Sequence, residues 1–289
     1  MGFLDIYLVE ALINGLLLGG VLALLALGLN LIFGVIDVVW ICYAELVMFG
    51  MYSMYYFAIV FGLGYWVAAP ISIVGVGIMG IALHVLVISP LLSSAPINQL
   101  LATGGVLFFL QSLATVAFGI EFRNLGIRLP TIEVADVFIS YARLLAFGAA
   151  LAGMVALYFF LTRTYMGTAI RAISQDREIM ALMGVDTRRV YLITSAVGGA
   201  LAGLGACLLV LQYDVHPYVG LSFGPITFMI CVMGGLGNMV GGFIAAFIFA
   251  EIISLGGLYL DLEWGYVFAF VFFIAMMFVR PAGLLARRS

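Results

Sequence analysis

Residues 163–189 carry a dense group of ionisable side chains, and their types and spacing point to protein docking. Long apolar segments flank this polar segment on both sides. A membrane protein with one substantial polar loop is expected to meet a soluble partner through that loop. The eight charged residues are Arg163, Arg171, Asp176, Arg177, Glu178, Asp186, Arg188 and Arg189.

The same segment carries the start and stop signals of a short helix over residues 175–183. Ser174 has a hydroxyl that can accept hydrogen bonds from the first backbone N–H groups of a helix, so we expect it to be the N-cap. Asp176 and Glu178 put negative charge in the first turn, where the helix dipole favours it. Gly184 lies where a left-handed residue would end the helix.

An apolar stripe runs along this predicted helix. Ile179, Leu182 and Met183 fall at positions i, i+3 and i+4, which share one helix face. The pattern predicts an amphipathic helix that lies outside the bilayer and docks on a partner. The periodicity leaves one alternative open, a solvated loop whose charges only set the membrane topology.

A second group of candidates consists of carboxylates in or beside the apolar segments. An ionisable group costs about 2.5–3.5 kcal/mol near the bilayer centre on insertion scales, so each one is a functional candidate. Asp37 is expected at the interface, whereas Glu45 and Glu251 lie deeper. Glu45, with Trp40 and Tyr43 close by in the sequence, and Glu251 are therefore candidates for a polar substrate path. The alternatives are a role in holding a broken helix together and a structural hydrogen bond.

The other reactive residue types exclude several classes of protein. All eleven basic residues are arginine, so the chain lacks the lysine that a phosphate-binding P-loop or a Schiff base needs. No nucleophile is paired with a base in the sequence, so we expect no enzyme activity. The absence of a basic stripe outside the polar loop argues against nucleic-acid binding. The two histidines and the three cysteines lack metal-ligand spacing, so no metal or other cofactor is expected; the cysteines are Cys42, Cys207 and Cys231.

Composition defines the elements that must position these residues. Of the 289 residues, 66% are hydrophobic and 9% are charged, which is typical of an integral membrane protein with little mass outside the lipid. We predict an all-α, polytopic transmembrane bundle of about 8–10 helical spans, each needing about 20 apolar residues. It forms a single domain over residues 1–289. The candidate spans are residues 8–33, 38–61, 65–88, 97–120, 142–162, 190–213, 222–236, 239–257 and 265–279.

Glycine placement indicates where helices break or pack closely. The seventh candidate span, 222–236, is short and runs into GGLGNMVGG, so a broken or re-entrant segment is an alternative to a full crossing. Three glycine pairs have the small-xxx-small spacing that lets helix backbones approach closely. They are Gly15 and Gly19, Gly199 and Gly203, and Gly237 and Gly241.

Arginine placement predicts the orientation of the bundle. Residues 163–189 and the C-terminal tail hold eight of the eleven arginines, and nine crossings put both on one side. By the positive-inside rule that side is cytoplasmic, which places the N-terminus outside and the C-terminus in the cytoplasm. The tail arginines are Arg280, Arg287 and Arg288, and the three on the opposite side are Arg123, Arg128 and Arg143.

The loop over residues 121–141 holds most of the remaining external charges, including Glu121, Glu133 and Asp136. It is long enough to form a small folded cap at the outer face, where it could meet an external partner. An exposed connector is the alternative that loop length leaves open.

Several stretches resemble LivH-type permeases, the membrane subunits of branched-chain amino acid ABC importers. The polar loop TRTYMGTAIRAISQDREIMALMGVD, followed by TSAVGGALAGLGACLL, is similar to the signature region of that family. The similarity continues through MGGLGNMVGGFIAAFIFAEI to the tail FVRPAGLL, and it includes NGLLLGGVLALLALGLNLIFGV and APINQLLATGGVLFFLQSLATVAFG. It therefore covers nearly the whole chain.

The resemblance implies a set of partners and a location. Such permeases lie in the cytoplasmic (inner) membrane of bacteria or archaea, in contact with lipid. They pair with a second, LivM-type permease subunit, two cytoplasmic ATPase subunits and an external solute-binding protein. The loop 163–189 would be the cytoplasmic coupling loop, and its helix would enter a groove on an ATPase subunit. The coupling residues implied are Ser174, Asp176, Arg177, Glu178, Ile179, Leu182, Met183 and Gly184.

One stretch departs from the family pattern. Relatives commonly carry an NFAHGE-like sequence after the first span, whereas this chain has WICYAE from Trp40 to Glu45. The substrate could therefore be a branched-chain or other amino acid, or a related small polar solute such as an amide, urea or a carboxylate. An ATP-independent channel or secondary transporter is the alternative function, because broken glycine-rich segments and intramembrane carboxylates fit it equally well.

Overall fold

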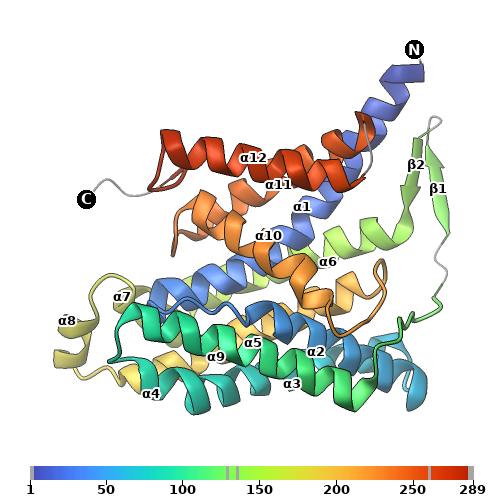
Figure 1. Cartoon of the computed structure of the whole chain (residues 1–289). Coiled ribbons are helices and arrows are strands. Elements are labelled where there is room, and N and C mark those ends of the chain that lie inside the picture. Colours follow the sequence, from blue (N-terminus) through green and yellow to red (C-terminus); the bar gives the residue numbers. More distant parts are fainter. Residues whose placement is uncertain (1–2, 128–129, 135–136, 260–261, 286–289) are drawn as a thin grey trace.

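The computed structural model describes residues 3–127, 130–134, 137–259 and 262–285. Helices lie side by side in one bundle (Figure 1). The start of α1 and the hairpin of β1 and β2 lie at one end, and the short helix α8 lies at the other. Four charged residues considered above, Arg128, Asp136, Arg287 and Arg288, lie outside the described residues.

The predicted helical bundle is confirmed. Within the described residues, seven helical segments are long and apolar enough to cross a membrane, and two apolar helices, α10 and α12, are shorter. Each of the nine candidate spans corresponds to one of them. The helices are α1 (Phe3–Ile36), α2 (Tyr43–Tyr55), α3 (Tyr65–Leu83), α5 (Pro96–Phe118), α6 (Tyr141–Arg163), α9 (Thr187–Leu209), α10 (Val219–Gly234), α11 (Met239–Tyr259) and α12 (Leu262–Val279).

π-Helical turns that the sequence did not indicate extend two of these helices, and α2, with 13 residues, reaches spanning length only through its turn. A turn at Tyr56–Val60 extends α2, and a turn at His84–Ile88 joins α3 to the short helix α4 (Ser89–Leu91). Such turns are usually local bulges within an α-helix. Here they continue α2 and α3 towards opposite ends of the bundle.

Close glycine contacts hold the centre of the bundle together. A Cβ at Gly15 would lie 2.6 Å from the Glu251 carboxylate of α11, and one at Gly203 would lie 3.0 Å from the Ile73 Cα of α3. The pairs beginning at Gly15 and Gly199 therefore act as predicted, between α1 and α11 and between α9 and α3. The third pair was wrong in part, because Gly237 lies in the turn between α10 and α11 with φ +78°.

The loop over residues 121–141 adds a small sheet to the helical fold. Strands β1 (Thr131–Val134) and β2 (Val137–Ser140) form an antiparallel hairpin, with Thr131 opposite Ser140. Arg123 also forms a two-residue bridge with Val215, which leads into α10. The loop is thus a folded cap rather than a simple connector.

Candidate functional site

The polar loop folds as two short helices. Helix α7 (Tyr165–Ile173) begins at Thr164, whose hydroxyl accepts a hydrogen bond from the Gly167 N–H at 3.0 Å. Ala169, Ile170 and Ile173 are buried, so α7 packs its apolar face on the bundle. This packing fixes the position of α7, and the helix that follows it is α8 (Arg177–Leu182).

Asp176, and not Ser174, is the N-cap of α8. The Asp176 Oδ1 accepts a hydrogen bond from the Ile179 N–H at 3.0 Å. The prediction for Ser174 was wrong because α7 continues to Ile173 and leaves Ser174 in a helical conformation, φ −67° and ψ −14°. Its hydroxyl donates back to the Arg171 carbonyl at 2.8 Å.

The predicted end of this helix at Gly184 is confirmed. Gly184 has φ +83°, a left-handed conformation that glycine adopts without steric cost. The Val185 N–H donates to the Met180 carbonyl at 3.2 Å and the Gly184 N–H donates to the Ala181 carbonyl at 3.1 Å. This pair of bonds is a Schellman motif, which satisfies the last carbonyls of the helix.

The apolar stripe of α8 is exposed. Ile179, Leu182 and Met183 are 56%, 88% and 76% exposed, on a helix that lies at one end of the bundle (Figure 1). The side chain of Glu178 lies outside what the structure describes. A capped helix that presents three large apolar side chains to its surroundings is typical of an interaction surface.

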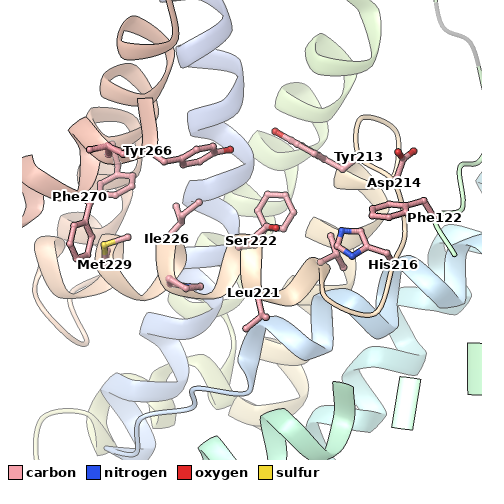
Figure 2. Close-up of a pocket in the computed structure, with 15 residues that line it drawn as sticks. Phe122, Tyr213, Asp214, His216, Leu221, Ser222, Ile226, Met229, Tyr266 and Phe270 are labelled. Carbon is pink, nitrogen blue, oxygen red and sulfur yellow. The ribbon is translucent and has the colours of Figure 1, made fainter. Parts of the chain in front are cut away.

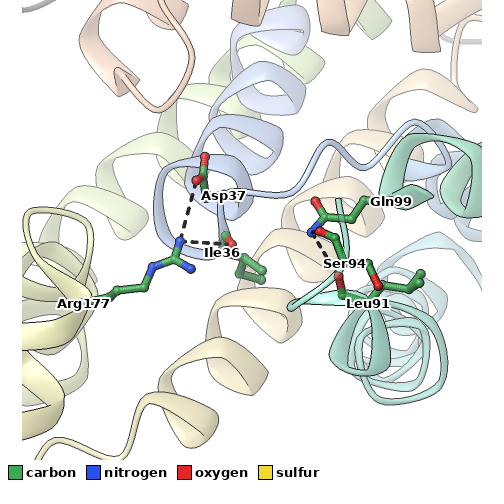
Figure 3. Close-up of polar contacts among 6 residues, drawn as sticks. All are labelled: Ile36, Asp37, Leu91, Ser94, Gln99 and Arg177. Carbon is green, nitrogen blue, oxygen red and sulfur yellow. Dashed lines mark hydrogen bonds and ion pairs between the residues drawn. The ribbon is translucent and has the colours of Figure 1, made fainter. Parts of the chain in front are cut away.

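Arg177 connects α8 to the end of α1. Its Nη2 lies 3.8 Å from the Asp37 carboxylate and donates to the Ile36 carbonyl at 3.5 Å (Figure 3). The two side chains are 46% and 71% exposed, so this ion pair contributes about 0–1 kcal/mol. This ion pair therefore contributes little to holding the loop against α1.

In the same view, the Gln99 amide closes the turn before α5 by donating to the Leu91 and Ser94 carbonyls.

The second span begins as a non-helical segment. Residues 37–42 are not part of a helix, and α2 starts at Tyr43, five residues later than the predicted span. Trp40 and Tyr43 are buried, and the Tyr43 hydroxyl donates to the Gly198 carbonyl of α9 at 3.3 Å. Glu45 therefore sits in the first turn of a broken helix.

Glu45 has no exposed surface, and only one of its two carboxylate oxygens has a hydrogen-bond partner among the described residues. The Gln111 amide of α5 donates to Glu45 Oε1 at 3.0 Å. Glu45 Oε2 has no hydrogen-bond partner within the part of the chain that the structure describes. The carboxylate lies against Gly220 in the first turn of α10, where an added Cβ would be 2.5 Å from Oε1.

A cavity of about 480 Å³ lies at the start of α2, and its lining includes Gly220, against which the Glu45 carboxylate packs. Most of its lining is apolar and comes from α1, α2, α5, α10 and the segment before α2. We call it the broken-helix cavity, because α2 and α10 both begin at its wall. Its lining includes Leu29, Trp40, Tyr43, Ala44, Gly104, Leu107, Phe108, Gly220, Gly224, Thr227 and Phe228.

The structure separates Glu251 from the other candidate path residues. Trp40 and Tyr43 line the broken-helix cavity, and Glu45 packs against Gly220 of its lining, whereas Glu251 packs against Gly15 on α1. Neither Glu45 nor Glu251 is among the described residues that line the broken-helix cavity. Sequence position alone could not distinguish these two carboxylates.

A larger cavity of about 670 Å³ lies at the end of the bundle where Arg123 is found. Side chains of α10, α12 and the segment before α10 meet around it, among them Tyr213, His216, Ser222 and Tyr266 (Figure 2). Burial lowers the pKa of His216 below its ordinary value, and the charge of Asp214 opposes this shift. The sequence did not single out His216 beyond its lack of metal-ligand spacing, and it did not predict this aromatic cavity.

Comparison with known proteins decides the family. The family model described as the permease component of the branched-chain amino acid transport system matches residues 11–277. The chain belongs to this family. It is accordingly a permease subunit of an ABC importer and a multi-pass protein of the cytoplasmic membrane, as the loop and tail motifs predicted.

Individual relatives agree with this assignment. The permease is 27% identical to the high-affinity branched-chain amino acid transport system permease protein LivH of Salmonella typhimurium, over 98% of this chain and 96% of the relative. BraD of Pseudomonas aeruginosa is 26% identical over 96% and 95%. A nucleoside ABC transporter permease protein of Lactococcus lactis, NupB, is 24% identical over 45% and 38%. Among solved structures, PsaBC from Streptococcus pneumoniae in complex with Fab is similar, with a TM-score of 0.49 and 14% identity over 98% and 93%.

The capping arrangement of the permease's polar loop gives a direct prediction. Asp176→Ala removes the acceptor for the Ile179 N–H and is expected to destabilise α8 by about 1 kcal/mol. Amide hydrogen exchange over residues 177–184 should become severalfold faster. Ser174→Ala is the matched control, since the Ser174 hydroxyl bonds only to α7. Equal acceleration in both variants would contradict the assignment of Asp176 as the N-cap.

Proposed function

We propose that this permease imports amino acids with apolar side chains, including branched-chain ones, and that α8 is the helix through which ATPase subunits drive it. Its partners would be a LivM-type permease, two cytoplasmic ATPase subunits and a solute-binding protein outside. The observation that carries the proposal is the exposed apolar stripe on a helix capped at both ends. A helix that only connected two spans would not need such a face.

The contacts of the loop suggest how movement of α8 is transmitted to the membrane-spanning helices. Helix α7 joins α8 to α6 and packs its buried face on the bundle, and α9 follows directly after α8. Arg177 also touches the segment that leads into the broken helix α2. Nucleotide-driven movement of the ATPases would shift these elements together and change access to the path. This requires the nucleotide state to favour one conformation through different contacts with α8.

Within this chain we place the substrate path at the broken-helix cavity. Trp40 and Tyr43 line it, Glu45 packs against Gly220 of its lining, and α2 and α10 both begin there. Discontinuous helices that begin at membrane depth are a common way to build a transport site, because their N-terminal ends and non-helical backbone are polar. Glu251 packs between α1 and α11, so we assign it to helix packing rather than to the path.

The orientation of the permease is part of the proposal. Arg171, Arg177 and Ala282 line one cavity, so the loop and the tail share a side. We infer that this side is cytoplasmic from the arginine distribution. A cysteine introduced at Gln175 is expected to react with a membrane-impermeant maleimide only in inside-out vesicles. A cysteine at Asn124, beside Asp214 at the other end, should react only in intact cells or spheroplasts. The reverse pattern would overturn the orientation.

Uptake by the assembled complex tests the function. Proteoliposomes that hold this permease with its partner permease and ATPases should accumulate leucine or valine only with the binding protein and ATP. Uphill accumulation by this chain alone would favour the channel or secondary-transporter alternative. Uptake of a nucleoside in place of any amino acid would retain the ABC mechanism and reject the proposed substrate.

A further inference from the structure

Open space lies on two faces of α10. Gly220 and Gly224 line the broken-helix cavity. Ser222 and Ile226 line the larger cavity of about 670 Å³ (Figure 2). The two pairs are offset by two residues, which corresponds to about 200° around a helix, so the cavities lie on opposite faces of α10. Helices inside proteins are usually packed closely on every side, whereas α10 can shift sideways with few contacts to break.

Two features of the sequence let the first half of α10 bend. Pro225 has no N–H and cannot donate to the Leu221 carbonyl, so one helical hydrogen bond is missing. Gly220 and Gly224 bring no side chains and lower the stability of the helix. Proline and glycine are the usual places at which helices bend. The end of α10 at the broken-helix cavity is therefore its more deformable end.

The other end of α10 is held by the tail of the chain, residues 280–285. The Leu284 N–H donates to the Met233 carbonyl, in the last turn of α10, at 2.7 Å. From the turn between α10 and α11, the Asn238 side-chain N–H donates to the Leu285 carbonyl at 2.6 Å. The tail therefore contacts both the end of α10 and the turn that follows it.

Helices α1 and α11 fix the same turn. Asn30 of α1 has no exposed surface, and its Oδ1 accepts a hydrogen bond from the Gly237 N–H at 3.1 Å. Gly34, one turn further along α1, approaches so closely that an added Cβ would lie 3.1 Å from the Gly237 Cα. Asn238 Oδ1 accepts from the Gly241 N–H at 3.0 Å and so caps α11. The turn is thus joined to α1, to α11 and to the tail.

This turn and the tail share a polar cavity of about 820 Å³ with the polar loop. Its lining comes from all three and includes Gly237, Asn238, Ala282, Arg171 and Arg177. Arg177 is the first residue of α8, the helix proposed to receive the ATPases. Water enters and leaves a cavity with polar walls readily, so its width can change at little cost. Displacement of α8 that closes the cavity would bring the loop against the turn and the tail.

We propose that α10 is the moving gate of the substrate path and that Asn238 is its positioning residue. Asn238 bonds to the tail with its N–H and to the start of α11 with its Oδ1, so the end of α10, the turn and the tail move as one unit. When the ATPases displace α8, this unit tilts α10 and changes the width of the broken-helix cavity. The inference rests on the proposed function and deepens it, because it identifies the element that opens the path.

Asn238→Ser tests the positioning role in the reconstituted complex. Serine keeps an N-cap acceptor for the Gly241 N–H, but its side chain is too short to reach the Leu285 carbonyl. Leucine uptake per ATP hydrolysed is expected to fall about tenfold, with the KM for leucine unchanged within about twofold. Leu236→Ala is the matched control in the same turn, since its side chain is 43% exposed and takes no part in these bonds. Equal losses of uptake and ATP hydrolysis, which leave the ratio unchanged, would show a merely structural role and overturn the proposal.

Pulsed electron paramagnetic resonance measures the movement of α10 directly. Spin labels on cysteines introduced at Tyr218, just before α10, and at Trp66, at the start of α3, report the position of the gate end; both side chains are exposed. The 16-residue helix is about 24 Å long, so a tilt of about 5° moves its far end by about 2 Å. Trapping the complex with ATP and orthovanadate should shift the distance by at least this much, and Asn238→Ser should abolish the shift. No shift in the chain with Asn238 intact, or the same shift in both chains, would overturn the proposal.

The outcomes separate the gate from the function. A wild-type complex that takes up no amino acid with binding protein and ATP refutes the proposed function. A wild-type complex that transports leucine, with a normal uptake per ATP in Asn238→Ser, refutes the positioning role alone. Asn238→Asp also keeps the cap acceptor and also lacks the N–H donor, so it replaces the serine variant if that variant fails to assemble. If neither variant assembles, the spin-label distance in the chain with Asn238 intact decides.

Discussion

Glutamate at both Leu182 and Met183 is expected to reduce ATP-driven uptake by about 100-fold or more. These two side chains are the most exposed members of the apolar stripe on α8. A docking helix lays such a face into an apolar groove of its partner. Two carboxylates buried there without basic partners would cost several kcal/mol. The measurements are leucine uptake by proteoliposomes and retention of the purified ATPase subunits on the tagged permease.

Ala181→Ser provides the matched control for this double variant. Ala181 is exposed on the same helix, and serine adds a hydroxyl without charge or much volume. Uptake in the control should stay within about twofold of wild type, since exposed substitutions outside an interface core have small effects. Wild-type uptake in the Leu182→Glu, Met183→Glu variant would mean that α8 does not receive the ATPases. The polar loop would then serve only to set topology, the alternative that periodicity left open.

Hydropathy was sufficient to predict the order of the apolar helices, because lipid forces each span to satisfy its backbone internally. Every candidate span has a helix whose bounds lie within about six residues of the predicted ones, whereas the short helices α4 and α7 were not predicted. The amphipathic helix in the loop was predicted for a similar reason, since the spacing of Ile179, Leu182 and Met183 is a local signal. Its C-terminus was predicted correctly because glycine at a left-handed position has few alternatives.

The N-cap could not be predicted because two suitable residues compete. Ser174 and Asp176 both favour N-cap positions, and the choice depends on where α7 ends. Helix α7 continues to Ile173 because Ala169, Ile170 and Ile173 find a place on the bundle. That packing involves residues far away in the sequence. Local capping rules therefore located the helix, whereas tertiary contacts decided which residue caps it.

The broken-helix cavity lies beyond sequence reasoning for the same physical reason. Glu45 and Glu251 give equal signals in the sequence, as single carboxylates in apolar runs. They differ because Gln111, 66 positions away, reaches Glu45, whereas Gly15 of α1 leaves room for Glu251. Residues 38–42, which are not helical, also have the hydropathy of an ordinary membrane span in the sequence. Only the three-dimensional arrangement shows that α2 and α10 begin at a common cavity.

Gly220→Ala is expected to reduce uptake by about tenfold or more and to lower the thermal unfolding temperature of the permease. The added Cβ would lie 2.5 Å from Glu45 Oε1 and 2.9 Å from Oε2, so either the carboxylate or α10 must move. Overpacking of a buried contact costs about 1–3 kcal/mol. Here the overpacking would weaken the contact between α2 and α10. Movement of Glu45 would also break its hydrogen bond to Gln111.

Gly104→Ala makes the same chemical change at another lining position of the cavity, on α5. A Cβ at Gly104 would meet nothing within 4 Å, so this variant should fold as stably as wild type and keep uptake within about threefold. The pair separates steric pressure on Glu45 from a general sensitivity of glycine positions in the membrane. Equal loss of uptake in both variants would show that the broken-helix cavity tolerates no added volume anywhere. Normal uptake by Gly220→Ala would mean that the position of the Glu45 carboxylate does not control transport.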